Sequence, residues 1–529
     1  MQLVEGCTLP QTVPALLDAA VDRFVERPAL VFFDDKRTLS YGALRELSCR
    51  LANGLAQCGL AKGMRVGVML GNRPEFPITW LAIARLGAVM VPINPSYTPR
   101  ELTYVLSDSS ASTLVIEDAS LPTLDQCSDR PAGLEDDRVV VVGDALRASA
   151  RRWADLVAGG APSHAPAESI HRDDLLNIQY TSGTTGFPKG CMLSHDYWLV
   201  ISRSAFAIDR DPAARMLSAQ PWFYMDPQWH FLKALWSGAA VYCAKRPSLS
   251  RYIFWVKQYG IEWCQFPQLA MQQPEALDDG ATRLKQAFLS GWRGEMVVEF
   301  ERRFKVIGRD IFGMTEIGTG TAMPFDADDM VGSGSCGLPG PWRRARICDA
   351  KGREVGPGEI GELEISGRAI LQGYWNKKQA TEAACRKGWF RTGDLFRRDE
   401  RGYYYIVGRI KEMIRRSGEN ISAQEIEAVV QMLPEISDVA AVAVPDPKRG
   451  EEVKLCVQLK PGIARSDCSV ERIEAHCRSH LAPFKVPRYY AYLDVFPRTS
   501  SDKIAKHLLT APDEDARRDS FDRVDALWR

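Results

Sequence analysis

The sequence predicts an α/β protein with a large N-terminal domain and a small α+β C-terminal domain. The chain has 529 residues, more than one hydrophobic core can serve, because single cores stop growing near roughly 250–300 residues. The composition, with 45% hydrophobic and 25% charged residues, is typical of globular proteins and argues against long disorder or fibrous repeats. At least two packed domains are therefore expected.

The N-terminal half follows the strand–helix–strand rhythm of a parallel sheet. In residues 65–94 the apolar runs VGVML and AVMVPIN flank the helical pattern EFPITWLAIARLG. Residues 149–169, rich in Ala, Pro, Ser and Arg, predict a surface connection, and a strand resumes in LLNIQYTSG. Between about Gly332 and Gly408, short apolar runs separated by Gly and Pro predict a β-rich subdomain.

The rhythm changes again after Arg409. Amphipathic segments such as SAQEIEAVVQML and VERIEAHCRSHL alternate with the strand-like runs VAAVAVP and EVKLCVQL, a pattern typical of a small α+β domain. We therefore expect a large domain of residues 1–408 and a small domain of residues 409–529.

Charge and cysteine content exclude several classes of protein. Lys plus Arg and Asp plus Glu number 67 each, so no net charge draws the chain to nucleic acid or anionic lipid. The 13 cysteines contain no C-x-x-C pair, which argues against a disulfide framework or a zinc ribbon. No signal-peptide pattern is present, and no apolar run reaches the roughly 18 residues of a membrane span. We expect a soluble, cytoplasmic protein.

The segment Tyr180–Gly190, YTSGTTGFPKG, has the composition of a phosphate-binding loop. Gly183 and Gly186 permit close backbone approach, so that successive N–H groups can surround an anion. The loop does not match the Walker A pattern, and such a segment alone is more often an ordinary turn. Its hydroxyl donors and its cation are Thr181, Ser182, Thr184, Thr185 and Lys189.

Together with four later segments, this loop resembles the acyl-CoA synthetase, adenylation-domain and luciferase superfamily. In the family order, the later segments are FGMTE (312–316), RTGD (391–394), GRIKEMIRRSGENISAQEIE (408–427) and PRTSSDKIAK (497–506). The resemblance covers nearly the whole chain and implies two parallel-type α/β sheets in the large domain, together with a mobile small domain. It points to the acid–CoA ligase branch, with some similarity to crotonobetaine/carnitine-CoA ligases.

The resemblance implies a two-step reaction. A small carboxylic acid attacks the α-phosphorus of ATP and gives an acyl-adenylate and pyrophosphate. The thiol of coenzyme A then displaces AMP. ATP, Mg²⁺ and coenzyme A are the expected cofactors and co-substrates, and a homodimer is compatible with the resemblance. Because negative charge accumulates at the reacting phosphorus, the site needs cations and donors there, and the expected catalytic residues are Lys503, Lys189 and Glu316.

The family match also assigns the nucleotide contacts. Glu316 and Thr184 would ligate Mg²⁺, which prefers oxygen ligands. Asp394 would accept hydrogen bonds from the ribose hydroxyls, and Arg409 would contact the ribose or a phosphate. The full set of expected ATP and AMP contacts is Thr181, Ser182, Gly183, Thr184, Thr185, Gly186, Lys189, Phe312, Gly313, Met314, Thr315, Asp394, Ile406, Arg409 and Lys503.

The small domain is expected to carry a catalytic lysine, a hinge and a loop that contacts coenzyme A. By the family match, Lys503 holds the substrate carboxylate and the α-phosphate oxygens during adenylation, although Asp502 stands where the family usually has Gly. Lys411 lies at the expected hinge, about which the small domain swings between two orientations. The loop with Gly418 would then guide coenzyme A.

Two segments depart from the family where the acid should bind. Tyr224 stands in place of a usual His, and Gly291, Trp292 and Arg293 stand where Gly, Gly and Ala are common. If these large side chains point inward, the pocket is short and disfavours a long straight acyl chain. The expected acid-pocket residues are Tyr224, Met225, Asp226, Trp229, Gly291, Trp292 and Arg293.

Aromatic residues are frequent in these segments. Trp222, Phe223, Tyr224, Trp229 and Trp292 would together suit an aromatic cage for an ammonium group, as in carnitine-type acids. A short, medium or aromatic acid would use the same surface, so the identity of the acid stays open.

Two other functions share these motifs. A stand-alone adenylation enzyme that loads a carrier-protein phosphopantetheine arm would use the same nucleotide residues. A non-catalytic nucleotide-binding homologue is the third possibility, against which the intact Lys189, Glu316, Asp394 and Lys503 argue. His476 and His480, four residues apart on an expected helix, are interpreted as a solvated face and not as a metal site.

Overall fold

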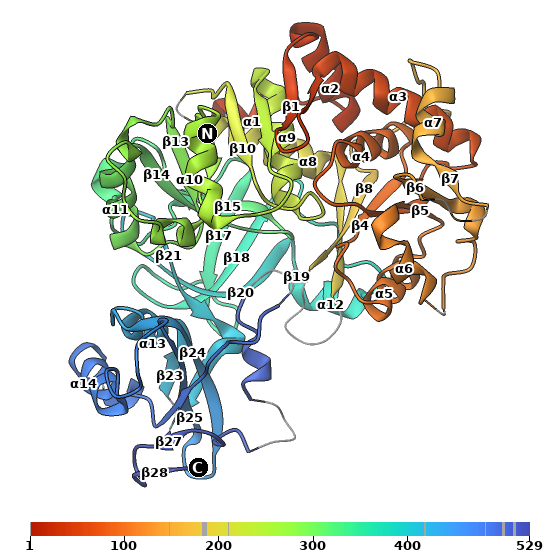
Figure 1. Ribbon diagram of the computed structural model, residues 1–529. Helices are drawn as coiled ribbons and strands as arrows, with labels where there is room; N and C mark the ends of the chain where they lie inside the picture. The colour runs from red at the N-terminus through yellow and green to blue at the C-terminus, as the bar shows by residue number, and fades with distance from the viewer. Residues whose placement is uncertain are drawn as a thin grey trace. The chain divides into compact units, whose positions relative to one another are not determined.

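The computed structural model describes residues 2–127, 129–145, 147, 149–181, 188–209, 211–416, 419–481, 483–499, 503–510 and 515–529. The chain forms two compact units (Figure 1). The large unit comprises Met1–Ala345 and Ile365–Phe390, and the small unit comprises Arg346–Glu364 and Arg391–Arg529. Both units are discontinuous in sequence, whereas the sequence predicts one boundary, between residues 408 and 409.

A seven-stranded sheet in the large unit has the order β7-β6-β5-β3-β4-β8-β9. Its strands are β3 Arg65–Met69, β4 Val89–Pro92, β5 Thr113–Glu117, β6 Val139–Val142, β7 Arg151–Arg152, β8 Leu175–Thr181 and β9 Lys189–Ser194. All neighbours are parallel except β8 and β9. Helix α4 (Glu75–Leu86) joins β3 to β4 and is buried along its whole length, so the predicted strand–helix–strand unit of residues 65–94 is confirmed.

The second large sheet has nine strands in the order β16-β15-β14-β13-β12-β10-β11-β1-β2. They are β1 Pro28–Phe32, β2 Arg37–Ser40, β10 Arg215–Ser218, β11 Ala240–Cys243, β12 Trp263–Gln265, β13 Gln286–Leu289, β14 Ile307–Met314, β15 Gly318–Ala322 and β16 Leu338–Pro339. From β1 to β14 the neighbours are parallel, and β2, β15 and β16 add antiparallel edges.

Helices separate many of these strands along the chain, although β1 and β2, β8 and β9, and β14 and β15 follow one another directly (Figure 1). In the large unit they are α1 Gln2–Glu5, α2 Val13–Phe24, α3 Tyr41–Gln57, α5 Pro99–Ser109, α6 Leu121–Asp125, α7 Trp153–Gly159, α8 His195–Ile208, α9 Met225–Ser237, α10 Leu249–Gln258, α11 Gly294–Phe304 and α12 Lys378–Ala384. No helix within the described ranges is both long and apolar enough to span a membrane.

The region predicted to be β-rich holds a five-stranded sheet, ordered β17-β18-β20-β19 with β21 beside β20. Its strands are β17 Arg343–Cys348, β18 Gly361–Gly367, β19 Cys385–Arg386, β20 Trp389–Arg398 and β21 Tyr404–Arg409. The boundaries between the two units fall inside β17, β18 and β20.

The rest of the small unit is the expected α+β fold. Its sheet has the order β23-β22-β25-β26-β27-β28, with β24 beside β25. The elements are β22 Met413–Arg416, β23 Glu419–Ser422, α13 Ala423–Val430, β24 Ile436–Asp446, β25 Gly450–Leu459, α14 Val470–His480, β26 Tyr489–Tyr492, β27 Phe521–Asp522 and β28 Leu527–Trp528. One apolar core joins both helices to the sheet.

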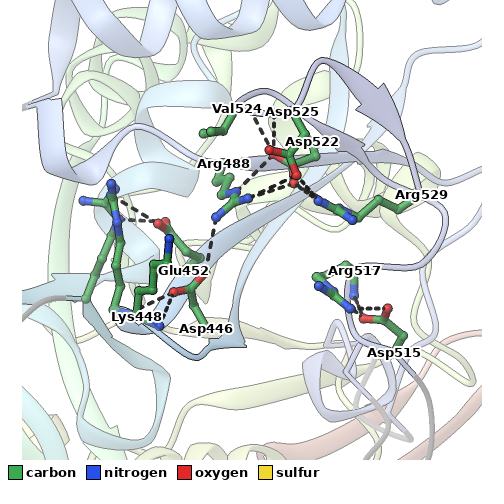
Figure 2. A network of polar contacts seen from close by, with 12 residues as sticks. Asp446, Lys448, Glu452, Arg488, Asp515, Arg517, Asp522, Val524, Asp525 and Arg529 are labelled. Carbon is green, nitrogen blue, oxygen red and sulfur yellow. Dashed lines mark hydrogen bonds and ion pairs between the residues drawn. The ribbon is translucent and has the colours of Figure 1, made fainter.

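The last strands are fastened by a buried carboxylate. Asp522 is fully buried and accepts hydrogen bonds from Arg488 and Arg529, while Arg488 also reaches Asp446 (Figure 2). Burial alone would raise the pKa of Asp522, but the two guanidinium groups outweigh it and hold that pKa well below its ordinary value. The pairing secures residues 521–529 to the small-unit sheet.

Candidate functional site

The predicted phosphate loop connects two antiparallel strands at the edge of the seven-stranded sheet. Thr181, the last residue of β8, lies opposite Lys189, the first residue of β9. The Thr181 hydroxyl donates to the Lys189 carbonyl at 3.4 Å. The predicted contacts Ser182, Gly183, Thr184, Thr185 and Gly186 lie outside the described residues.

Lys189 and Glu316, which come from different motifs, share Tyr374 as a partner. The Tyr374 hydroxyl donates to Glu316 Oε1 at 2.9 Å. The Lys189 ammonium lies 4.3 Å from the centroid of the Tyr374 ring, a cation–π contact. Burial, followed by the negative charge of Glu316, raises the pKa of Tyr374 far above its ordinary value. A neutral phenol therefore contacts both a buried carboxylate, through its hydroxyl, and a cation, through its ring.

The FGMTE motif forms the end of β14 and the turn that follows. A β-bulge separates Phe312 from Gly313 in the pairing with β15, and such bulges change the direction of side chains next to functional sites. The backbone beyond the bulge is held by the Tyr197 hydroxyl, which donates to the Thr315 carbonyl at 2.8 Å. Glu316 follows at once and is 7% exposed.

In the small unit, the two predicted ribose contacts form an ion pair. Asp394 on β20 lies opposite Arg409 on β21. Arg409 Nε is 2.9 Å from Asp394 Oδ1, and the Asp394 side chain is 2% exposed against 43% for Arg409. Ile406, on the same strand as Arg409, is 40% exposed. The hairpin thus joins an acceptor and a cation from two separate motifs.

Lys503 lies at the end of a small hairpin. The Thr499 N–H donates to the Lys503 carbonyl at 2.8 Å, and the Lys503 N–H donates to Thr499 Oγ1 at 3.2 Å. The Lys503 side chain is exposed. Lys411 lies in the turn Ile410–Glu412, while Asp502 and Gly418 lie outside the described residues.

In the first predicted acid-binding segment, Pro221–Phe231, the turn at residues 220–226 is fixed by three side-chain amides. Asn72 donates to the carbonyl of residue 220 at 2.9 Å and accepts the Trp222 N–H at 2.8 Å. Gln179 donates to the carbonyl of residue 223 at 2.8 Å. Gln228 donates to the carbonyls of residues 222 and 224 at 2.9 and 3.0 Å. All three amides are buried. Asn72 and Gln179 come from distant segments, whereas Gln228 lies on α9, directly after the turn.

The second acid loop is fixed in the same way, by a carboxylate. Asp310 on β14 accepts the N–H groups of Gly291 at 3.3 Å and Trp292 at 3.0 Å. Burial raises the pKa of Asp310 to about 7, although these N–H groups oppose the shift. Arg293 occupies the N-cap position of α11 without a side-chain capping hydrogen bond, and it is half-buried.

The predicted aromatic cage is wrong, because its tryptophans pack in separate places. Trp222 is 0% exposed, and Trp229 and Trp292 are each 5% exposed. The neighbours are Phe76 and Phe231 for Trp222, Trp263 and Phe288 for Trp229, and Phe266 and Phe300 for Trp292. The Trp229 indole also donates to Asp226 at 3.0 Å. Trp292 belongs to the core around α10 and α11, so its bulk does not by itself shorten an acid pocket.

Comparisons with known proteins show the family of the chain. Residues 17–375 match the AMP-binding enzyme family, and residues 425–503 match the AMP-binding enzyme C-terminal domain. The chain is 30% identical to a long-chain-fatty-acid–CoA ligase of Escherichia coli O157:H7 over 541 residues, covering 94% of each protein. It is also 30% identical to the mitochondrial medium-chain acyl-CoA ligase ACSF2 of Mus musculus, covering 94% of this chain and 87% of that protein.

Solved structures show the same architecture. ATP-bound MatB from Rhodopseudomonas palustris superposes with a TM-score of 0.84 at 25% identity, covering 94% of this chain and 98% of that one. The anthranilate CoA ligase AuaEII, in complex with anthranoyl-AMP, has a TM-score of 0.85 at 22% identity, with 96% and 98% covered. This chain therefore belongs to the AMP-binding enzyme family, in the acid–CoA ligase branch of its superfamily.

Proposed function

We propose that this protein is an ATP-dependent acid–CoA ligase that activates a carboxylic acid as its acyl-adenylate and transfers the acyl group to coenzyme A. The observation that carries the proposal is the contact of Lys189 and Glu316 with one tyrosine, Tyr374. A cation and a carboxylate that contact the same tyrosine suit a magnesium–nucleotide complex, which presents both signs of charge.

The proposed roles follow from the chemistry of each side chain. Lys189 and Lys503 supply positive charge that offsets the negative charge growing as the acid attacks the α-phosphorus. Asp394 accepts hydrogen bonds from the ribose, and Arg409 holds its carboxylate in place. We assign the hinge to Lys411 and the coenzyme A loop to Gly418, on the resemblance alone.

Glu316 suits the metal that such a reaction needs. Its carboxylate is a hard oxygen ligand, and its hydrogen-bond partner Tyr374 is a neutral group, so no protein cation neutralises it in that contact. When bound, Mg²⁺ would neutralise phosphate charge. Thr184, the second predicted ligand, lies outside the described residues.

For the acid, we propose a medium-length or aromatic carboxylate. The named relatives include a medium-chain and a long-chain ligase, and the core position of Trp292 removes the main argument for a very short pocket. A betaine-like acid loses its support, since no five-ring cage surrounds an ammonium site.

Pyrophosphate release from a panel of carboxylates, with and without coenzyme A, tests the proposal. We expect release with the correct acid alone and multiple turnovers only when coenzyme A is added. Lys503→Ala should lose adenylate formation yet keep most thioester formation from supplied acyl-AMP. Equal loss of both half-reactions would contradict the role of Lys503, and turnover only with a phosphopantetheinyl carrier protein would contradict coenzyme A as acceptor.

A further inference from the structure

Lys506 joins three segments of the small unit through two ion pairs. Its Nζ lies 2.9 Å from Glu412 Oε2 and 2.8 Å from Glu427 Oε1. Glu412 belongs to the turn that follows Arg409, and Glu427 lies on α13. One ammonium therefore ties the segment after Lys503 to two other elements.

The charges in this cluster depend on one another. Burial raises the pKa of Glu427, and the like charge of Glu412 adds to the rise, whereas Lys506 opposes it. Burial disfavours the charged form of Lys506, yet the two carboxylates outweigh it and raise its pKa. Glu427 also accepts the Ala441 N–H of β24 at 2.6 Å. Without the ammonium, two half-buried carboxylates would be left close together.

The backbone on both sides of Lys503 is anchored. Arg498 pairs with Ile504 in an isolated β-bridge, and its guanidinium lies 2.8 Å from Asp438 on β24. On the other side of Lys503, the Ala505 N–H donates to the Pro497 carbonyl at 2.8 Å. Lys506 comes next in the chain. Its ion pair with Glu412 connects this segment to the Ile410–Glu412 turn, which the ion pair of Arg498 with Asp438 does not do.

We propose that Lys506 is a positioning residue for Lys503. Lys506 holds residues 504–506 against the 410–412 turn and α13. In this way it fixes the position of the Lys503 backbone, from which the flexible Lys503 side chain extends. Misplacing a reacting group by about 1 Å can cost up to a hundredfold in rate, so this anchor is expected to matter for adenylation. The inference rests on the proposed role of Lys503.

The test compares Lys506→Met and Lys506→Arg in both half-reactions of the full-length enzyme. Methionine keeps the length of the side chain and removes the charge. We expect Lys506→Met to lower kcat for pyrophosphate release by about ten- to a hundredfold, with the KM for ATP changed less than about threefold. Thioester formation from supplied acyl-AMP should stay within about threefold, because Lys503 is not needed there. Lys506→Arg should restore most of the adenylation rate, because a guanidinium can also bind two carboxylates.

Lys485→Met is the matched control. Lys485 is 21% exposed, against 22% for Lys506, and its Nζ lies 2.6 Å from Glu425 of the same helix. The substitution Lys485→Met removes a comparable Lys–Glu ion pair outside the Lys503 hairpin. The rates of both half-reactions should be unchanged in this variant.

Three results would overturn the inference: normal adenylation in Lys506→Met, equal loss of both half-reactions, or an equal adenylation defect in Lys485→Met. If Lys506→Met does not fold, Glu412→Gln removes one of the two ion pairs and should lower the adenylation rate by about three- to tenfold. An unchanged rate in Glu412→Gln would count against the inference.

Lys503→Ala in the same assay separates the two proposals. Unimpaired adenylation in that variant refutes the role of Lys503 and with it the positioning role, whereas loss in Lys503→Ala but not in Lys506→Met refutes the inference alone.

Discussion

The nucleotide-binding residues and the acid-pocket loops of this protein are held in place by different means. Lys189 and Glu316 contact one tyrosine through their functional groups, and Asp394 pairs directly with Arg409. The loops at 220–226 and 290–294 are held through their backbones, by Gln228 of the adjoining helix α9 and by amide and carboxylate side chains from other segments.

This difference explains which of the two regions a sequence reveals. A phosphate or a ribose needs particular charges, so its residues recur as motifs with fixed types. In the acid loops the side chains that look suggestive, such as Trp222 and Trp292, serve the core, and the groups that shape the loops are buried amides without a pattern. Residue type predicts function where a ligand such as a phosphate needs a particular charge. It predicts function poorly where the packing of the core determines the direction of a side chain.

The largest expected effect is on stability, from Trp292→Ala. Removing a large buried aromatic side chain typically costs about 3–5 kcal/mol in free energy of unfolding, and urea unfolding measures it. The acid preference should be unchanged. Phe254→Ala, at a residue on α10 that is 52% exposed, is the control and should change the free energy of unfolding by less than about 0.5 kcal/mol. A broader range of accepted acids with little loss of stability would show that Trp292 faces the pocket after all.

Asp394→Ala should weaken AMP binding by about a hundredfold, because hydrogen bonds to a charged group contribute roughly 1.5–3 kcal/mol. Isothermal titration calorimetry with AMP and ATP checks this. Asp399, whose carboxylate accepts the Tyr403 N–H and the Tyr405 hydroxyl in the same hairpin, provides the control. Asp399→Ala should leave nucleotide affinity unchanged. If Asp394→Ala changed only the affinity for the acid, the assignment of Asp394 to the ribose would be contradicted.

A third expected effect is a pH dependence of stability at Asp310. Its pKa is raised to about 7 by burial, against about 4 in an unfolded chain. The folded protein therefore keeps a proton that the unfolded chain releases, so this group destabilises the fold increasingly from about pH 4 to pH 7 and by a constant amount above that. Relative to wild type, Asp310→Asn should gain up to about 1.4 kcal/mol per pH unit in this interval. If the profiles of unfolding free energy against pH were parallel for the wild type and Asp310→Asn, the raised pKa of Asp310 would be contradicted.

Much of the fold could be predicted from the sequence. The strand–helix–strand unit of residues 65–94, the β-rich region and the α+β character of the small unit follow from hydrophobic periodicity, which is a local property. The two discontinuous units were not foreseen, because the boundaries fall within strands whose sequence shows no break. Tyr374 was also missed, since nothing near it in the chain indicates a partner for Glu316.

By itself, the sequence determined the family and the identity of the charged residues expected at the nucleotide, because reactive chemistry constrains residue type and order along the chain. The tertiary structure decided that Tyr374 joins Lys189 to Glu316, that Asn72, Gln179, Gln228 and Asp310 hold the acid loops, and that the tryptophans turn into the core. Apart from the local contacts of Gln228, these outcomes depend on contacts between residues far apart in the chain, and burial can be known only once those contacts have formed.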